Sequence, residues 1–151
     1  MFSTVRRFIK TAILFLFVGL IYGGWLLYRR EILGAWPSSH QVSAHAHVIA
    51  VGFVMFLILG VALWMFPRPA KDDRRYRPRR IETAWWILAP ATAVRFVTEA
   101  AGPGEPGSWP GWLILASATG QFVGLALYFH TMWPRIRPVG SQLREEKGEK
   151  F

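Results

Sequence analysis

The sequence contains no cysteine among its 151 residues, and it has only nine acidic residues against 18 lysines and arginines. The absence of cysteine excludes disulfide bonds, thiolate metal sites, iron–sulfur clusters and covalently attached c-type haem. The shortage of acidic residues leaves a formal charge of +9, which is typical of nucleic-acid-binding proteins and also of many membrane proteins. The distribution of the apolar residues, 52% of the chain, distinguishes between these two classes.

The apolar residues are concentrated in four blocks of about 20 residues, the length that crosses roughly 30 Å of hydrocarbon. We predict an all-α integral membrane protein in which residues 1–138 form one transmembrane four-helix bundle. A polar tail at 139–151 is predicted to be disordered. The predicted helices cover about 11–28, 44–66, 83–102 and 111–133. The first block is interpreted as a retained helix rather than a signal peptide, because it is long and no small-residue cleavage site follows it.

Lysine and arginine are distributed unevenly over the segments outside these blocks. Fifteen of them lie before the first block, in 67–82 or after residue 133, whereas the other two loops hold only Arg29 and Arg30. The positive-inside rule therefore predicts that both termini and the long linker face the cytoplasm. The eight tryptophans lie near predicted helix ends, as in an aromatic belt. The positive charge is thus attributed to contact with a lipid bilayer, and no nucleic-acid partner is expected.

Small residues recur at intervals of four in two of the blocks. They are Gly19 and Gly23 in the first block, and Ala116, Gly120 and Gly124 in the fourth. Such stripes allow two helices to approach closely, either within one chain or between two copies of it.

Ionisable residues inside apolar blocks are costly, and each is a functional candidate. His45 and His47 lie in the first two turns of the second predicted helix, and Arg95 and Glu99 lie towards the end of the third. Antiparallel helices would place all four in the outer half of the membrane. Arg95 and Glu99 are spaced i, i+4 and can pair along one helix face. His130 lies too far along the fourth helix to share one haem iron with His45 or His47.

His45 and His47 are two residues apart, so on a helix their side chains point about 200° apart. Both therefore cannot bind one metal ion on a regular helix. One is expected to face the interior, and the other is expected to face lipid headgroups, a loop or a partner. The alternative interpretation is a pair of outer-surface histidines.

The second block has a His-x-His start, a glycine seven residues after the first histidine and a Trp-x-x-Pro-Arg ending. These residues are His45, His47, Gly52, Trp64, Pro67 and Arg68. They resemble the second transmembrane helix of haem–copper oxidase subunit I, in the versions found in cbb3-type oxidases and nitric oxide reductases. With Gly19, Gly23, Arg95, Glu99 and the closing Trp133-Pro134-Arg135, most of 5–138 resembles small four-helix bacterial membrane proteins labelled as subunit-I-like.

The resemblance implies a b-type haem near the outer face, with His45 as the axial ligand and His47 as its substitute. Arg95 would face a haem propionate, and Glu99 would hold Arg95 or the ligand imidazole in place. The implied function is electron transfer or the handling of a diatomic gas, in a bacterial inner membrane. The implied partners are other respiratory subunits or a second copy of the chain. The chain lacks the further helices and histidines of subunit I, so it is not expected to be a complete oxidase or reductase alone.

Two alternatives remain open. The chain can be a cofactor-free structural or assembly subunit, in which Arg95, Glu99 and the histidines lock helices together. It can also hold a divalent metal ion between Glu99 and one of the histidines His40, His45 or His47, because imidazole and carboxylate suit zinc, copper or iron.

Overall fold

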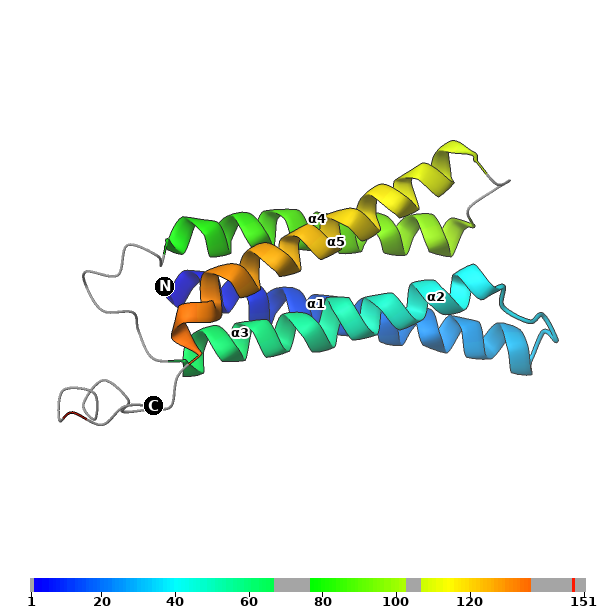
Figure 1. Cartoon of the computed structure of the whole chain (residues 1–151). Coiled ribbons are helices and arrows are strands. Elements are labelled where there is room, and N and C mark those ends of the chain that lie inside the picture. The colour runs from blue at the N-terminus through cyan, green and yellow to red at the C-terminus, as the bar shows by residue number, and fades with distance from the viewer. Residues whose placement is uncertain (1, 67–76, 103–106, 137–147, 149–151) are drawn as a thin grey trace.

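The computed structural model describes residues 2–66, 77–102, 107–136 and 148, so the tail predicted to be disordered lies, apart from residue 148, outside the described residues. The described part of the chain is all-helical, and its four long helical segments lie side by side (Figure 1). The first segment is α1 (Phe2–Glu31), and the second is a continuous helix made of α2 (Ser39–His47), the π-helix η1 (Val48–Met55) and α3 (Phe56–Met65). The third segment is α4 (Pro78–Ala101), and the fourth is α5 (Trp109–Met132), followed by the 3₁₀ turn η2 (Trp133–Arg135).

Three stretches of the described residues are long and apolar enough to cross a membrane. They are Ser3–Glu31, Ser39–Met65 and Trp109–Arg135. The helix α4 is not one of them, because it carries Arg95 and Glu99 in addition to charged residues near its start.

The helix boundaries follow signals at the ends of each segment. The helix α1 starts well before residue 11, since its early basic residues are good helix formers. Ser38 caps α2 by accepting a hydrogen bond from the backbone N–H of Gln41, and the Gln41 side chain accepts one from the backbone N–H of Ser38. This capping box begins the second segment several residues before the predicted position 44. Pro78 occupies the first turn of α4, where a missing N–H costs nothing.

The helix α1 packs antiparallel against the second segment, and we call this pair the first hairpin (Figure 1). Glycines line the contact, and Gly19 and Gly23 of the first stripe are among them, so this stripe serves packing within the chain. A Cβ atom on Gly52 would lie 2.8 Å from Cγ of Phe15, and one on Gly23 would lie 2.6 Å from Cε1 of His45. The two helices therefore approach more closely than any larger side chain would allow.

The helices α4 and α5 form the second hairpin, in which Gly124 brings α5 close to Leu88 of α4. Figure 1 shows α5 crossing over α4 and reaching α3 at the end of the molecule where α1 begins. We call this end, with the start of α1 and the end of α5, the base of the molecule. The opposite end, with the start of α2 and the end of α4, is called the top.

The two hairpins meet at the base through buried aromatic and polar contacts. The Phe8 ring packs against the rings of Phe56 and Tyr128, with centroids 5.5 Å and 5.6 Å away. The Tyr128 hydroxyl donates to the Leu59 carbonyl of α3 at 2.5 Å. The Trp85 indole N–H donates to the Thr11 hydroxyl at 3.1 Å, which joins α4 to α1.

Arg135 in η2 adds a further contact between the two hairpins at the base. Its side chain is buried, and its Nη2 donates to the carbonyls of Leu63 and Phe66 at 3.2 Å and 2.8 Å. A cation that binds the last carbonyls of a helix satisfies groups that otherwise have no partner. Arg135 thus fastens the end of the fourth segment to the end of the second.

Candidate functional site

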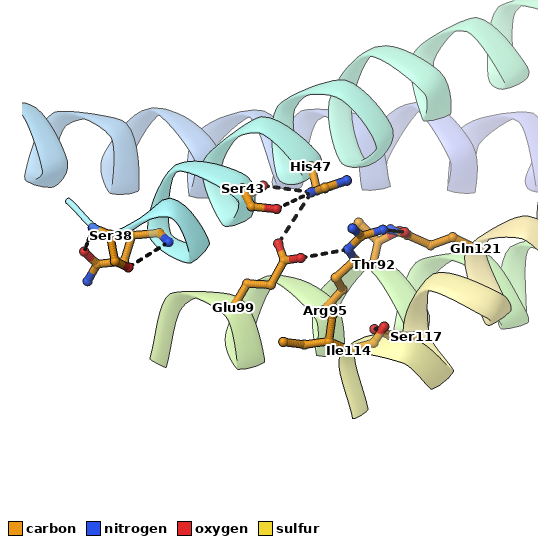
Figure 2. A network of polar contacts seen from close by, with 10 residues as sticks. Ser38, Ser43, His47, Thr92, Arg95, Glu99, Ile114, Ser117 and Gln121 are labelled. Atoms are coloured by element: carbon orange, nitrogen blue, oxygen red, sulfur yellow. Dashed lines mark hydrogen bonds and ion pairs between the residues drawn. The ribbon is translucent and has the colours of Figure 1, made fainter. Parts of the chain in front are cut away.

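A polar network joins the two hairpins near the top of the molecule, where α2 faces α4 (Figure 2). The Arg95 Nε donates to Glu99 Oε1 at 3.1 Å, which confirms the pairing predicted from their spacing. The other carboxylate oxygen, Glu99 Oε2, lies 3.4 Å from Nδ1 of His47. The Glu99 side chain is only 3% exposed, so its charge depends on Arg95 for compensation, and its Oε2 accepts no hydrogen bond among the described residues.

The His47 ring is held through one of its two nitrogens. Its Nδ1 lies 2.9 Å from the Ser43 carbonyl oxygen and 3.1 Å from the Ser43 hydroxyl, in addition to its contact with Glu99. A carbonyl oxygen can only accept, so Nδ1 carries the proton. The Nε2 of a neutral ring then keeps its lone pair, and Figure 2 shows it on the side of the ring away from Glu99. The His47 side chain is 31% exposed, so the ring can be reached from outside.

On its other side, Arg95 is held by the fourth segment. Its Nη1 donates to Gln121 Oε1 on α5 at 2.9 Å. The Gln121 amide nitrogen donates to the Thr92 hydroxyl at 3.1 Å, and this hydroxyl donates to the Leu88 carbonyl at 2.8 Å. The network therefore extends continuously from Ser43 on α2, through α4, to α5.

The backbone changes from α-helix to π-helix directly after His47. A π-helical stretch is rare, and it occurs frequently next to functional sites. No residue pattern in the sequence indicated it.

His45 lies on the other side of the second segment, against α1 rather than α4. Its ring contacts Gly23, and its Nδ1 is buried without a hydrogen-bond partner among the described residues. The Tyr22 hydroxyl on α1 is likewise buried without one. The Tyr22 ring packs edge-on against Phe96 of α4, with centroids 5.1 Å apart, so these atoms also belong to the top of the molecule.

The structure thus brings together three of the four residues that the sequence singled out, namely His47, Arg95 and Glu99. His45 does not join them, which corrects the expectation that it lies beside Arg95 and Glu99. The reason is geometric: residues two apart on a helix point in nearly opposite directions, so only one of the two histidines can face α4. His130 is exposed in the last turn of α5, at the base of the molecule and far from this network.

Gln121, Thr92 and Ser43 are the members of the network that the sequence did not assign to the site. A single amide in an otherwise apolar helix was the available signal for Gln121, because a buried amide needs partners. The sequence signal for Ser43 was weaker: Ser43 lies four residues before His47, the spacing at which side chains meet on a helix.

Two further observations near the top bear on ligand binding. Among the described residues, no group of three or more histidine, aspartate or glutamate side chains is placed to hold a metal ion. An open apolar groove of about 470 Å³ lies between the top halves of α4 and α5, lined by residues such as Val97, Trp109 and Leu113. Neither His45 nor His47 lines this groove.

The network combines an imidazole with one free nitrogen, a buried carboxylate and a half-buried guanidinium. This set can ligate a haem iron and receive its carboxylate groups, or it can lock three helices together without any ligand. The chain matches no known protein family, and neither a curated protein nor a solved structure matches it.

Proposed function

We propose that the protein is a small subunit of the bacterial inner membrane that binds a b-type haem through His47, near the top of a four-helix membrane bundle. The observation that carries the proposal is the state of the His47 ring. Histidines that bind a metal usually donate their other ring N–H to a carboxylate or a backbone carbonyl. Here Nδ1 faces both, in Glu99 and in Ser43, and Nε2 is left as the donor atom for iron.

The residues around His47 suit the needs of a haem. Glu99 would orient the ligand imidazole and increase its basicity. Arg95 is 18% exposed and carries further N–H groups beyond those used by Glu99 and Gln121, so it is suited to a propionate. The unpartnered Tyr22 hydroxyl and His45 Nδ1 are further polar atoms at this level. A bound b-type haem would supply one-electron chemistry or a binding site for a diatomic gas.

The resemblance to haem–copper oxidase subunit I supports the same cofactor but favours His45 as the ligand. The geometry favours His47, because His47 and not His45 contacts the carboxylate. A role within a respiratory assembly, with other subunits or a second copy, follows from the resemblance alone.

Visible spectroscopy of the purified protein tests the cofactor. The wild-type protein, expressed with ample haem and purified in detergent, should show a Soret band and reducible α and β bands. The band should be lost in His47→Ala and kept in His130→Ala, the matched control at the base. Loss of the band in His45→Ala but not in His47→Ala would transfer the ligand role to His45. A wild-type protein without a Soret band would contradict haem binding.

The membrane topology is part of the proposal, and α4 is its critical element. The polar side chains Thr92, Thr98 and Glu99 of α4 are buried against the other helices, whereas Trp86 and Val97 are exposed. A helix with its polar side buried by neighbours and its apolar side outwards is suited to lipid despite its charges. The aromatic belt and the distribution of lysine and arginine then support four spans with both termini in the cytoplasm.

Cysteine labelling tests this orientation, and the absence of native cysteine removes any background. A cysteine at Tyr76, in the long linker, should react with a membrane-impermeant reagent only after the cells are opened. A cysteine at Trp36, between the first two segments, should react in intact cells. The opposite result would reverse the orientation.

A cofactor-free structural subunit is the second candidate, and one observation favours it. Arg95 has hydrogen-bond partners in Glu99 and Gln121 without any ligand, so the network is able to join three helices by itself. In that case the spectrum would show no haem, while Glu99→Leu would still weaken the association of the two hairpins.

A further inference from the structure

Gln121 connects the fourth segment to the network by two hydrogen bonds of opposite direction. The residue is 5% exposed; its Oε1 accepts from Arg95, and its Nε2 donates to Thr92. The Thr92 hydroxyl is in turn committed as a donor to the Leu88 carbonyl. Each of these three hydrogen bonds therefore has a defined donor and acceptor.

These directions fix the orientation of the Gln121 amide. If the amide were flipped, its NH₂ group would face the Arg95 guanidinium, and two donors would oppose each other. The carbonyl oxygen would then take the Thr92 hydroxyl proton away from Leu88. The observed orientation satisfies all three groups, and the flipped one does not.

A guanidinium is planar and rigid, so an anchor on one nitrogen sets the direction of the others. Gln121 binds Nη1 of Arg95, while Nε of the same group binds Glu99. The second oxygen of that carboxylate is the one that faces Nδ1 of His47. The position of Gln121 is thus transmitted to His47 through two rigid planar groups.

We propose that Gln121 is a positioning residue, which holds the Glu99 carboxylate against the Nδ1 side of the His47 ring from the opposite hairpin. Its consequence for a haem rests on the proposed function, but the effect on the imidazole does not. The Ser43 carbonyl keeps the proton on Nδ1, and Gln121, through Arg95, keeps the Glu99 carboxylate beside that N–H group.

Ser117 provides the matched control. It lies one turn before Gln121 on α5 and is also buried, but its hydroxyl donates to the Ile114 carbonyl of its own helix (Figure 2). Its removal changes a buried polar group of α5 without touching the chain that leads to His47.

The decisive experiment is ¹⁵N NMR of histidine-labelled full-length protein in detergent micelles at about pH 8, where an ordinary imidazole is neutral. The chain has only four histidines, so His47→Ala identifies the signals of His47. In the wild type these signals should be those of a ring protonated at Nδ1. Gln121→Leu should shift the Nδ1 signal, because Arg95 and with it the Glu99 carboxylate lose their anchor on α5, and Ser117→Ala should leave it unchanged.

Unchanged His47 signals in a folded Gln121→Leu protein would overturn the proposal. If this variant does not fold, Gln121→Glu replaces it. The glutamate keeps an acceptor for Arg95 but competes with Glu99 for it, so the His47 signals should again shift. Unchanged signals in that variant would overturn the proposal in the same way.

The haem-loaded protein provides a second readout that separates the two proposals. Gln121→Leu should shift the haem midpoint potential and Ser117→Ala should not, since only the former disturbs the ligand imidazole. A wild-type protein without a Soret band would refute haem binding, whereas the NMR result would still decide the role of Gln121.

Discussion

The two hairpins are held together internally by different means. The first consists of two long stretches that are mainly apolar, and glycines such as Gly52 bring its backbones into close contact. The second also has a glycine contact at Gly124, but its α4 carries Arg95 and Glu99 in the same span. Lipid can solvate the first hairpin on all its outer faces, whereas the charges of the second need protein partners. The first hairpin therefore contributes the His47 imidazole from a mainly apolar scaffold, and the second supplies the charged groups of the network.

The largest loss of stability should come from removing the buried negative charge of the second hairpin. Glu99→Leu removes the buried partner of the half-buried Arg95, which we expect to lower the free energy of unfolding by about 3–5 kcal/mol. Glu99→Gln should cost less, because the amide oxygen still accepts from Arg95. Unfolding by SDS titration in mixed micelles measures both.

The control for this prediction is Glu82→Gln, which removes an ion pair with Arg7 that is partly exposed on both sides. Its cost should stay below about 1 kcal/mol. If Glu99→Leu were as mild as this control, the buried charges would not distinguish the two hairpins.

Arg135→Met should have the next largest effect, and it acts where the hairpins join. The change removes two charge-assisted hydrogen bonds to the end of α3, and a bond of this kind contributes about 1.5–3 kcal/mol. We expect a loss of about 3 kcal/mol in the same SDS titration. Arg79→Met, at an exposed position near the start of α4, is the control and should change the stability little.

Gly52→Ala tests the close packing of the first hairpin. The added Cβ would meet Cγ and Cβ of Phe15 at 2.8 Å and 2.9 Å, and Cβ cannot move without the backbone of α1. We expect a loss of about 2 kcal/mol from overpacking. Gly24→Ala has nothing within 4 Å of the new atom and should be neutral or slightly stabilising. Equal effects of the two changes on the thermal unfolding temperature would contradict close glycine packing.

Tyr128→Phe should have the smallest effect. It removes the hydrogen bond to the Leu59 carbonyl but keeps the ring contact with Phe8, so the expected loss is about 1 kcal/mol. Tyr28→Phe, at an exposed position on α1, is the control. A loss of stability for Tyr128→Phe no larger than that of the control would mean that this hydrogen bond adds nothing to the contact between the hairpins.

The sequence predicted those parts of this arrangement that depend on local spacing. Four apolar blocks indicated the four segments, and the i, i+4 spacing indicated the contact between Arg95 and Glu99. The capping box of Ser38 and Gln41 was also legible in the sequence and would have moved the start of the second segment to its observed place.

The parts that could not be predicted depend on how one helix is rotated against another. Whether His45 or His47 faces Glu99 is decided by the packing of the second segment between α1 and α4. The π-helix after His47 arises from a shift of backbone hydrogen bonds and has no residue signature. The role of Gln121 needs the crossing of α4 and α5, since its partner Arg95 lies on a different helix.

The division into two hairpins also has a consequence for biosynthesis. The first hairpin is complete once the ribosome has made residue 66, and its close packing needs nothing that follows. His47 acquires its carboxylate only after α4 has been made, and Arg95 acquires Gln121 later still. The chain therefore passes through a stage in which Arg95 and Glu99 are already synthesised but α5 is not. We expect insertion of α4 into the lipid phase to await synthesis of α5, so that the second hairpin enters the membrane as one unit.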